Sequence, residues 1–293
     1  MLVKTSHADS VEPSISPQEC LERRINACCY DSVRYAAGRL NLCAITLPDV
    51  TSLNKLLIDD SLPILNANGK AISFADQNMD PSADGYEAQI FSSGTVPTRP
   101  NNVHDLFNAL VWASFPRSKA ALNGRHMAAR QLRLTGNNRG PVQDALTLFD
   151  ECGVIVLSDR TDLLAHIEHF EWKELFWRQR EAVNHHMKFF LFGHGLMEQM
   201  LTPFIGLTGK ALLMNVESAW LQARIDGVAS GHALLQHIDA RSSTQIASPA
   251  CFVRGRDLLP LPLLGIPGWS AENERESFYD NAHYFRPGRR KEE

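Results

Sequence analysis

The stretch DALTLFDECGVIVL, residues 144–157, lies where helical and extended patterns meet, and the predicted fold is built outward from it. Two apolar runs, residues 146–149 and 154–157, flank the tetrapeptide from Asp150 to Gly153. A tetrapeptide of this composition suits a tight turn between two strands. The stretch therefore predicts a short helix that begins at Asp144 and leads into a hairpin.

Helical patterns dominate on both sides of this stretch. Asn102 is a candidate N-cap with Asp105 three residues later, which predicts the start of a helix. Pro116 ends that helix or starts the next one, which extends to residue 134. Ser16 and Pro17 mark another helix start. Further helices are expected at residues 16–37, 50–58, 162–169, 172–187, 189–200 and 218–240, and further strands at 72–74, 86–91 and 211–216. The predicted fold is α+β and mainly helical, with small antiparallel β elements near residues 70–95 and 146–157.

The composition is that of an ordinary globular protein. Of the 293 residues 44% are hydrophobic and 21% are charged, so a sizeable core is possible. The net charge of −4 disfavours nucleic acid as a partner. No apolar run approaches the roughly 20 residues that span a bilayer, and no signal peptide is recognised. We expect a cytoplasmic protein without a membrane partner, with a disordered segment at residues 1–15 and a single globular unit at residues 16–293.

A first candidate site lies at the start of the helix after Asn102. His104, Asp105 and Asn108 are three or four residues apart, so they share a helix face. Imidazole, carboxylate and amide groups on one exposed turn can bind a metal or orient a general base. The alternative is an N-terminal cap with polar surface residues, which the residue types alone favour.

A second candidate is the pattern Gly193-His194-Gly195-x-x-Glu198, in a segment otherwise rich in Phe, Leu and Met. A polar pair on an apolar helix must find partners once it is buried. His194 and Glu198 would form half of a metal or acid–base site, or a hydrogen bond that joins two helices. The second interpretation is favoured because buried polar groups are usually simply hydrogen-bonded.

Charge is distributed unevenly along the chain. No acidic residue lies between Asp105 and Asp144, and such a basic stretch can mark a site for phosphate or another anion. Arg117 is the best candidate, with Lys119 beside it, because helix N-termini attract anions. A solvated helix face paired with acids from elsewhere explains the pattern equally well. The basic residues are Arg117, Lys119, Arg125, Arg130, Arg133 and Arg139.

The acidic residues and the absence of known motifs limit the kinds of site and the classes of protein that the sequence supports. Asp144, Asp150 and Glu151 could serve a metal, but the predicted turn already explains Asp150 and Glu151. The sequence has no GxGxxG, P-loop, GxSxG, HExxH or paired CxxC motif. Nucleotide-binding proteins, serine hydrolases and classical zinc proteases are therefore disfavoured.

Several motifs occur in a characteristic order along most of the chain. They are VHDLFNALVW (103–112), FPR (115–117), KAALN (119–123), RGP (139–141), DALTLFDE (144–151), WKELFW (172–177), FGH (192–194) with Glu198, LLGIPGW (263–269), FYD (278–280) and YFRP (284–287). Together they resemble a bacterial family of uncharacterised proteins, domain of unknown function 3025. The resemblance covers roughly residues 86–290 and implies one structural unit there. It implies no activity, although it places His104, Asp105, Asn108, His194 and Glu198 in the family's pattern.

Two hypotheses follow from these patterns. The first is a metal-assisted hydrolase of an anionic or phosphorylated small molecule. In it His104, Asp105, His194 and Glu198, with Asn108 beside them, hold a divalent metal and activate water, while Arg117 and Lys119 neutralise the substrate. It requires His104 and His194 to lie within about 12 Å of each other, because ligands reach one ion at about 2 Å. The second is a non-catalytic binding or scaffold protein that presents a basic helical face to an acidic partner or to nucleic acid.

Overall fold

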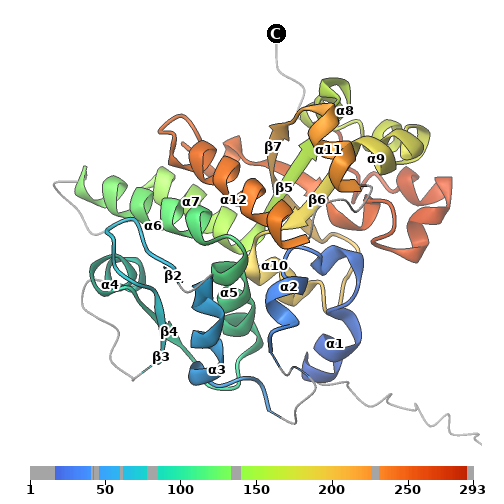
Figure 1. The fold of residues 1–293 in the computed structure, drawn as a ribbon. Helices are drawn as coiled ribbons and strands as arrows, with labels where there is room; N and C mark the ends of the chain where they lie inside the picture. The colour runs from blue at the N-terminus through green and yellow to red at the C-terminus, as the bar shows by residue number, and fades with distance from the viewer. Residues whose placement is uncertain are drawn as a thin grey trace, which may run out of the picture.

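A four-stranded mixed sheet organises the fold in this computed structural model, which describes residues 17–40, 42, 46–59, 62–77, 85–132, 140–225 and 231–288 (Figure 1). The strand order is β6-β5-β7-β8. Strand β5 pairs in parallel with β7 and antiparallel with β6, and β7 pairs antiparallel with β8. Every residue of β5 is buried, as its continuous apolar run requires. The strands are β5 (Gly153–Ser158), β6 (Met187–Leu191), β7 (Thr208–Asn215) and β8 (Leu259–Pro262).

The helix before β5 is longer than the sequence predicts. Helix α7 (Pro141–Cys152) includes residues 146–149, so the predicted hairpin is wrong. Pro141 occupies the first helical turn, and Leu146 and Phe149 recur at helical spacing on a fully buried face. In a short apolar run, hydrophobic periodicity does not distinguish a strand from a buried helical turn. Residues 150 and 151 therefore end a helix, and β5 pairs with strands much later in the chain.

The predicted strand at residues 86–91 is also helical, forming α4 (Tyr86–Ser93). Gly85 and Gly94 flank it with φ angles of 85° and 79°, which glycine adopts readily. The Gly94 N–H donates to the Ile90 carbonyl at 2.9 Å and ends the helix. Helix α4 connects β3 (Ser73–Asp76) to β4 (Thr95–Thr98), which pair in parallel. The predicted strand at 72–74 is thus confirmed in β3, but its partner is β4.

The apolar segment predicted as one helix at residues 189–200 contains two elements. Its first part completes β6, because aromatic and aliphatic side chains fit against the buried β5. The backbone N–H groups of Phe192 and Gly193 then both donate to the Gly153 carbonyl, at 2.9 and 2.8 Å. This turn over the start of β5 makes His194 the first residue of the short helix α10 (His194–Gln199).

The other helices pack on one another and on the sheet. Helix α6 (Pro116–Gln131) lies against α7 and α12 (Gly231–Ala247), and α10 lies against α5 (Val103–Ser114) and α7 (Figure 1). The helix predicted at 16–37 ends early, at Arg24, while Ser16 and residues 1–15 lie outside the described residues. The remaining elements are α1 (Pro17–Arg24), η1 (Cys28–Tyr30), α2 (Arg34–Ala37), α3 (Val50–Asn54), η2 (Lys55–Leu57), β1 (Ile58–Asp59), β2 (Leu62–Pro63), α8 (Thr161–Glu168), the π-helical turn η3 (Glu174–Arg178), α9 (Arg180–His186), α11 (Ser218–Ile225), η4 (Gly255–Asp257), η5 (Leu263–Gly265), η6 (Ala271–Glu274) and η7 (Glu276–Asp280).

The described chain is α+β and mainly helical, as predicted. Three of its five strand pairings are antiparallel, and the β3–β4 and β5–β7 pairings are parallel. The buried hydrophobic side chains form one cluster that extends from Leu21 to Phe285. Within the described ranges, every helix is too short or too polar to cross a membrane. A single globular unit and a cytoplasmic location stay predictions.

Candidate metal centre

The first turn of α5 positions His104. The Asn102 side chain accepts a hydrogen bond from the Asp105 backbone N–H at 3.0 Å, which confirms the predicted N-cap. The following residues of α5 are almost all buried, so burial fixes how the helix is rotated about its axis. This rotation turns the His104 imidazole toward α10, and 27% of the side chain stays exposed.

Two glycines allow His194 to approach the end of α7. A Cβ atom on Gly193 would lie 2.5 Å from backbone atoms of Glu151, Cys152 and Gly153. A Cβ atom on Gly195 would lie 2.4 Å from the Glu151 carboxylate and 3.5 Å from His104 Cε1. Since real Cβ contacts are not this short, a larger residue at position 193 would push α10 away from the end of α7, and one at position 195 would displace the Glu151 carboxylate. The Gly-His-Gly sequence is therefore what lets α10 pack closely against α7.

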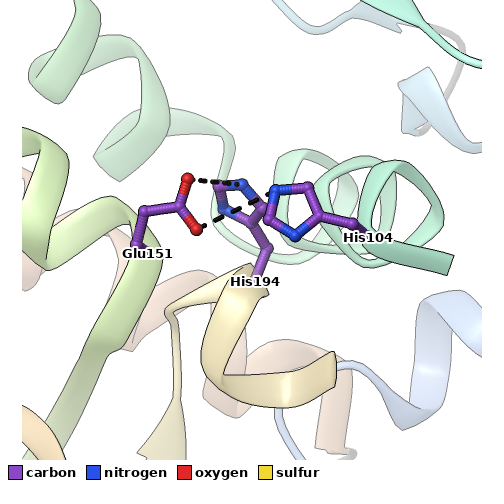
Figure 2. Close-up of side chains that lie close together, drawn as sticks. All are labelled: His104, Glu151 and His194. Carbon is purple, nitrogen blue, oxygen red and sulfur yellow. Dashed lines mark ion pairs between the residues drawn. The ribbon is translucent and has the colours of Figure 1, made fainter. Parts of the chain in front are cut away.

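His104, His194 and Glu151 converge at the meeting point of α5, α10 and α7 (Figure 2). The two imidazole rings are 4.5 Å apart between centroids, far below the 12 Å limit set from the sequence. Glu151 Oε2 lies 3.8 Å from His104 Nε2, and Glu151 Oε1 lies 3.5 Å from His194 Nε2. Ligands at about 2.1 Å from one tetrahedral ion are roughly 3.4 Å apart. One ligand atom from each residue lies within 4.8 Å of the others, so the three atoms would close by up to about 1.4 Å to surround one ion.

Each imidazole is oriented by a hydrogen bond at its other nitrogen. His104 Nδ1 lies 3.0 Å from Glu198 Oε2, and His194 Nδ1 lies 2.9 Å from the Asp150 carbonyl oxygen. A carbonyl oxygen and an ionised carboxylate only accept, so both Nδ1 atoms carry the proton. Both Nε2 atoms then present a lone pair toward Glu151. Histidine ligands of metal ions are typically oriented in this way.

Burial favours the protonation state that a metal requires at His194 and opposes it at Glu151. It lowers the pKa of His194 to about 4, so this imidazole is neutral near pH 7. Burial also raises the pKa of the Glu151 carboxyl above its usual range, against the opposing influence of His104. Metal ligands must be unprotonated. The neutral His194 therefore meets that requirement before any metal binds.

Stability of the metal-free protein should depend on pH through His194. Because its folded-state pKa of about 4 lies below the usual 6.5, the unfolded chain binds more protons between these values. Stability is then complete above about pH 6.5 and falls as the pH drops toward 4. The shift corresponds to about 3 kcal/mol at about 1.4 kcal/mol per pKa unit. Urea unfolding in chelator at pH 7.5 and 4.5 would measure the loss.

His194→Gln is the matched control for this pH dependence, because it cannot titrate. It should lose less stability than the wild type between the two pH values. Burial raises the pKa of Asp239 to about 6, which acts in the opposite direction over the same interval. Both proteins share Asp239, so its effect cancels in the difference between them. Equal losses in the two proteins would show that His194 titrates normally.

A buried ion pair lies behind the two histidines. The Lys119 ammonium donates to the two Asp150 carboxylate oxygens at 2.6 and 2.8 Å, and to Asn108 Oδ1 at 3.0 Å. Asn108 in turn donates to the Tyr86 hydroxyl at 2.9 Å. Burial acts to raise the pKa of Asp150, but Lys119 and His194 outweigh it, and the pKa is lowered. Lys119 and Asn108, both predicted site residues, thus support Asp150 and not the metal ligands directly.

The structure brings some predicted residues together and separates others. His104, His194 and Glu198 meet, but both Asp105 carboxylate oxygens are bound by the Arg99 guanidinium, at 2.7 and 3.0 Å. Arg117 is exposed, and its backbone N–H donates to Asp239 at 2.9 Å, so a carboxylate already occupies that helix N-terminus. The third ligand, Glu151, was attributed to a turn. Its position two residues before a glycine and a buried strand is the available signal.

The fold and this site define a mainly helical α+β protein with a two-histidine, one-carboxylate cluster between three helices. A family model described as Protein of unknown function (DUF3025) matches residues 72–289, so the chain belongs to that family. This confirms the resemblance seen in the sequence, with a start somewhat earlier than residue 86. No curated protein and no solved structure matches the chain.

Proposed function

We propose that the protein is a metal-dependent hydrolase whose metal is held by His104, His194 and Glu151. The observation that supports this most is the pair of imidazoles whose Nε2 atoms face one carboxylate while their Nδ1 atoms are hydrogen-bonded. Two histidines and a glutamate are a recurring ligand set of hydrolytic zinc sites. A divalent metal there would activate water and polarise the scissile carbonyl or phosphoryl group.

The protein side chains prepare this site in three ways. They supply a neutral imidazole, because burial keeps the pKa of His194 low. They leave positions for water and substrate, since the Glu151 and Glu198 side chains are 39% and 44% exposed. They also supply Glu198, whose carboxylate lies beside His104 and is the nearest candidate for a proton acceptor from water.

A cavity with a mixed polar and apolar lining beside the start of α5 offers room for a substrate. It has a volume of about 430 Å³, which is the size of a small-molecule site. Thr98, Arg99 and Asn101 line it, together with other hydroxyl and carboxylate groups. Successive Cα atoms are 3.8 Å apart, so the Asn101 Cα lies within about 11 Å of the His104 Cα. A polar substrate of moderate length could occupy the cavity and reach the metal ligands.

The charge of the substrate is not part of the proposal. Lys119 is neutralised by Asp150, and the helix N-terminus at Arg117 is occupied by Asp239. Glu151 of the cluster and Glu198 beside it are two carboxylates that repel an anion until a cation is bound. Arg99, the cation that lines the cavity, is bound to Asp105, so the anionic or phosphorylated substrate expected from the sequence is not carried into the proposal.

The basic helix α6 gives little support to the scaffold hypothesis. The Arg125 guanidinium donates to the backbone carbonyls of Ile246 and Cys251, at 3.0 and 2.5 Å, and so belongs to the internal packing. Arg133 and Arg139 lie outside the described residues. The described part of this helix therefore does not present the continuous basic face that the hypothesis needs.

A substrate screen with Glu151→Gln tests the hydrolase. Protein loaded with Zn²⁺, Mn²⁺ or Fe²⁺ would be assayed on a panel of amides, carboxylic esters and phosphoesters. We expect one class to be hydrolysed, with kcat/KM at least about 100-fold lower in Glu151→Gln, since a group acting directly in catalysis contributes at least that much. Glu168→Gln, at the exposed end of α8, is the control. Equal rates in Glu151→Gln and wild type would exclude this site.

A further inference from the structure

A small cavity lies behind the metal ligands, lined by side chains of α4, α5, α6 and α7. It has a volume of about 10 Å³, roughly the minimum that holds a single water molecule. Its lining combines polar and apolar side chains, with the Lys119–Asp150 ion pair on one side. Trp112, Asn123 and Glu87 also border it.

Two of the lining side chains lack a hydrogen-bond partner. The Trp112 indole Nε1–H and the Asn123 Oδ1 are both buried, on residues that are 1% and 2% exposed. Leaving a buried donor and a buried acceptor unpaired is unfavourable, and native proteins rarely do so without a water molecule or an ion. One of these groups donates and the other accepts, and both border the same cavity.

We propose that this cavity holds one ordered water molecule that positions Asp150. The water accepts a hydrogen bond from Trp112 Nε1 and donates to Asn123 Oδ1 and to an Asp150 carboxylate oxygen. This makes three hydrogen bonds, the usual number for a buried water. Each acceptor has capacity for it, because a carboxylate has about four lone-pair sites and Lys119 takes two of them.

The water matters for the site because Asp150 links to two of the metal ligands. The Asp150 carbonyl accepts the His194 Nδ1–H, and the next residue is Glu151. The Trp112 ring also lies under the Lys119 ammonium, 5.5 Å from the ring centroid, on the same ion pair. Trp112 and Asn123 thus act as positioning residues through Asp150. This role rests on the proposed function, whereas the water site itself does not.

Nuclear magnetic resonance on metal-free protein tests the water directly. The chain has five tryptophans, and Trp112→Phe identifies the Trp112 indole signal by its loss. We expect that signal to show a cross-peak to bound water. The Trp172 indole is the internal control, because it donates to the Arg286 carbonyl at 2.9 Å and should show none. Absence of the Trp112 cross-peak would overturn the water site.

Metal affinity tests the positioning role. Trp112→Phe should weaken metal binding about 10-fold, at the lower end of the roughly 10- to 100-fold range for residues that support ligands. Trp172→Phe, which removes an indole N–H elsewhere, should leave the affinity unchanged. Equal affinities in the two variants would overturn the role. If Trp112→Phe does not fold, Asn123→Ser replaces it, and sequential assignment identifies the wild-type indole.

The metal-binding result for the wild type also distinguishes failure of the positioning role from failure of the proposed function. If the wild type binds no metal, the proposed function fails, and the ¹⁵N-labelled histidine spectrum decides the positioning role. The His194 Nδ1–H signal should then shift in Trp112→Phe but not in Trp172→Phe, because only the first disturbs the Asp150 carbonyl. An unchanged His194 signal in both variants would overturn it.

Discussion

His104→Ala and His194→Ala are each expected to lose a divalent metal that the wild type binds near one equivalent per chain. Each substitution removes one of the three ligand side chains that meet at the cluster. We expect an affinity loss of more than about 100-fold, because residues that only orient a ligand already contribute roughly 10- to 100-fold. Elemental mass spectrometry on protein purified without chelator or affinity tag would measure the content, and chelator competition would measure the affinity.

Two control variants, one at a residue that orients a ligand and one at a histidine away from the cluster, make this test specific to the three-ligand cluster. Glu198→Gln keeps every ligand but replaces the carboxylate that orients His104 at 3.0 Å, so its loss should fall between about 10- and 100-fold. His185→Ala removes an exposed imidazole on α9 and should change nothing. Equal metal content in all four variants and the wild type would contradict the site. Loss in His104→Ala alone would show that the histidines do not share one ion.

The sequence indicated the two histidines because each pattern contained a polar pair with helical spacing. His104 near an N-cap and His194 four residues before Glu198 are local features, and local rules describe them correctly. What no local rule supplies is the contact between residues 104 and 198, which lie 94 positions apart. The sequence paired His194 with Glu198, whereas the structure pairs Glu198 with His104 and gives His194 a backbone carbonyl.

The missed ligand follows from the wrong secondary structure at residues 146–151. When those residues are assigned to a strand and a turn, Glu151 belongs to a solvent-exposed turn with no geometry in common with the histidines. In the helix α7 its side chain projects from the last turn toward α10. The segment is helical because Leu146 and Phe149 are then fully buried, with Phe149 packed on Phe192 and Phe252, a tertiary effect that periodicity over four residues cannot reveal.

For the cationic residues the error has the opposite sense. The basic stretch predicts anion binding, whereas the structure places Lys119 in a buried ion pair that stabilises the fold. Lys119 was expected to meet a substrate anion, but it is 5% exposed and paired with Asp150. A buried lysine without such a partner would be strongly unfavourable. The basic stretch therefore indicates a residue near the site, Lys119. Its role depends on Asp150, which is 31 positions away and comes close only when the helices pack.

Gly195→Ala is expected to abolish tight metal binding while the protein remains folded. The new Cβ would lie 2.4 Å from Glu151 Oε2, so the carboxylate must rotate away from the two imidazoles. The carboxylate is the mobile end of a side chain, and alanine gains about 1 kcal/mol over glycine in a helix, so the free energy of unfolding should change by no more than about 1 kcal/mol. Metal affinity should fall about 100-fold or more.

Gly193→Ala, two residues away, is expected to give the opposite result, with loss of folding stability. Its Cβ would lie 2.5 Å from three backbone atoms at the junction of α7 and β5, including the nitrogen of Gly153. That backbone cannot move easily, because Gly193 N–H donates to the Gly153 carbonyl at 2.8 Å and Gly153 begins a fully buried strand. We expect a loss of about 3 kcal/mol or more in urea unfolding.

Gly231→Ala provides the matched control for both glycine variants, since its Cβ would meet nothing within 4 Å. It should leave metal affinity unchanged and alter the free energy of unfolding by no more than about 1 kcal/mol, the helix preference of alanine over glycine. The two site variants separate helix packing from metal binding. The Cβ added at position 193 would contact backbone atoms, whereas the Cβ added at position 195 would contact the side chain of the ligand Glu151. If Gly195→Ala bound metal as tightly as Gly231→Ala, Glu151 would not be a ligand. If Gly193→Ala were as stable as Gly231→Ala, the close approach of α10 to α7 would not be required.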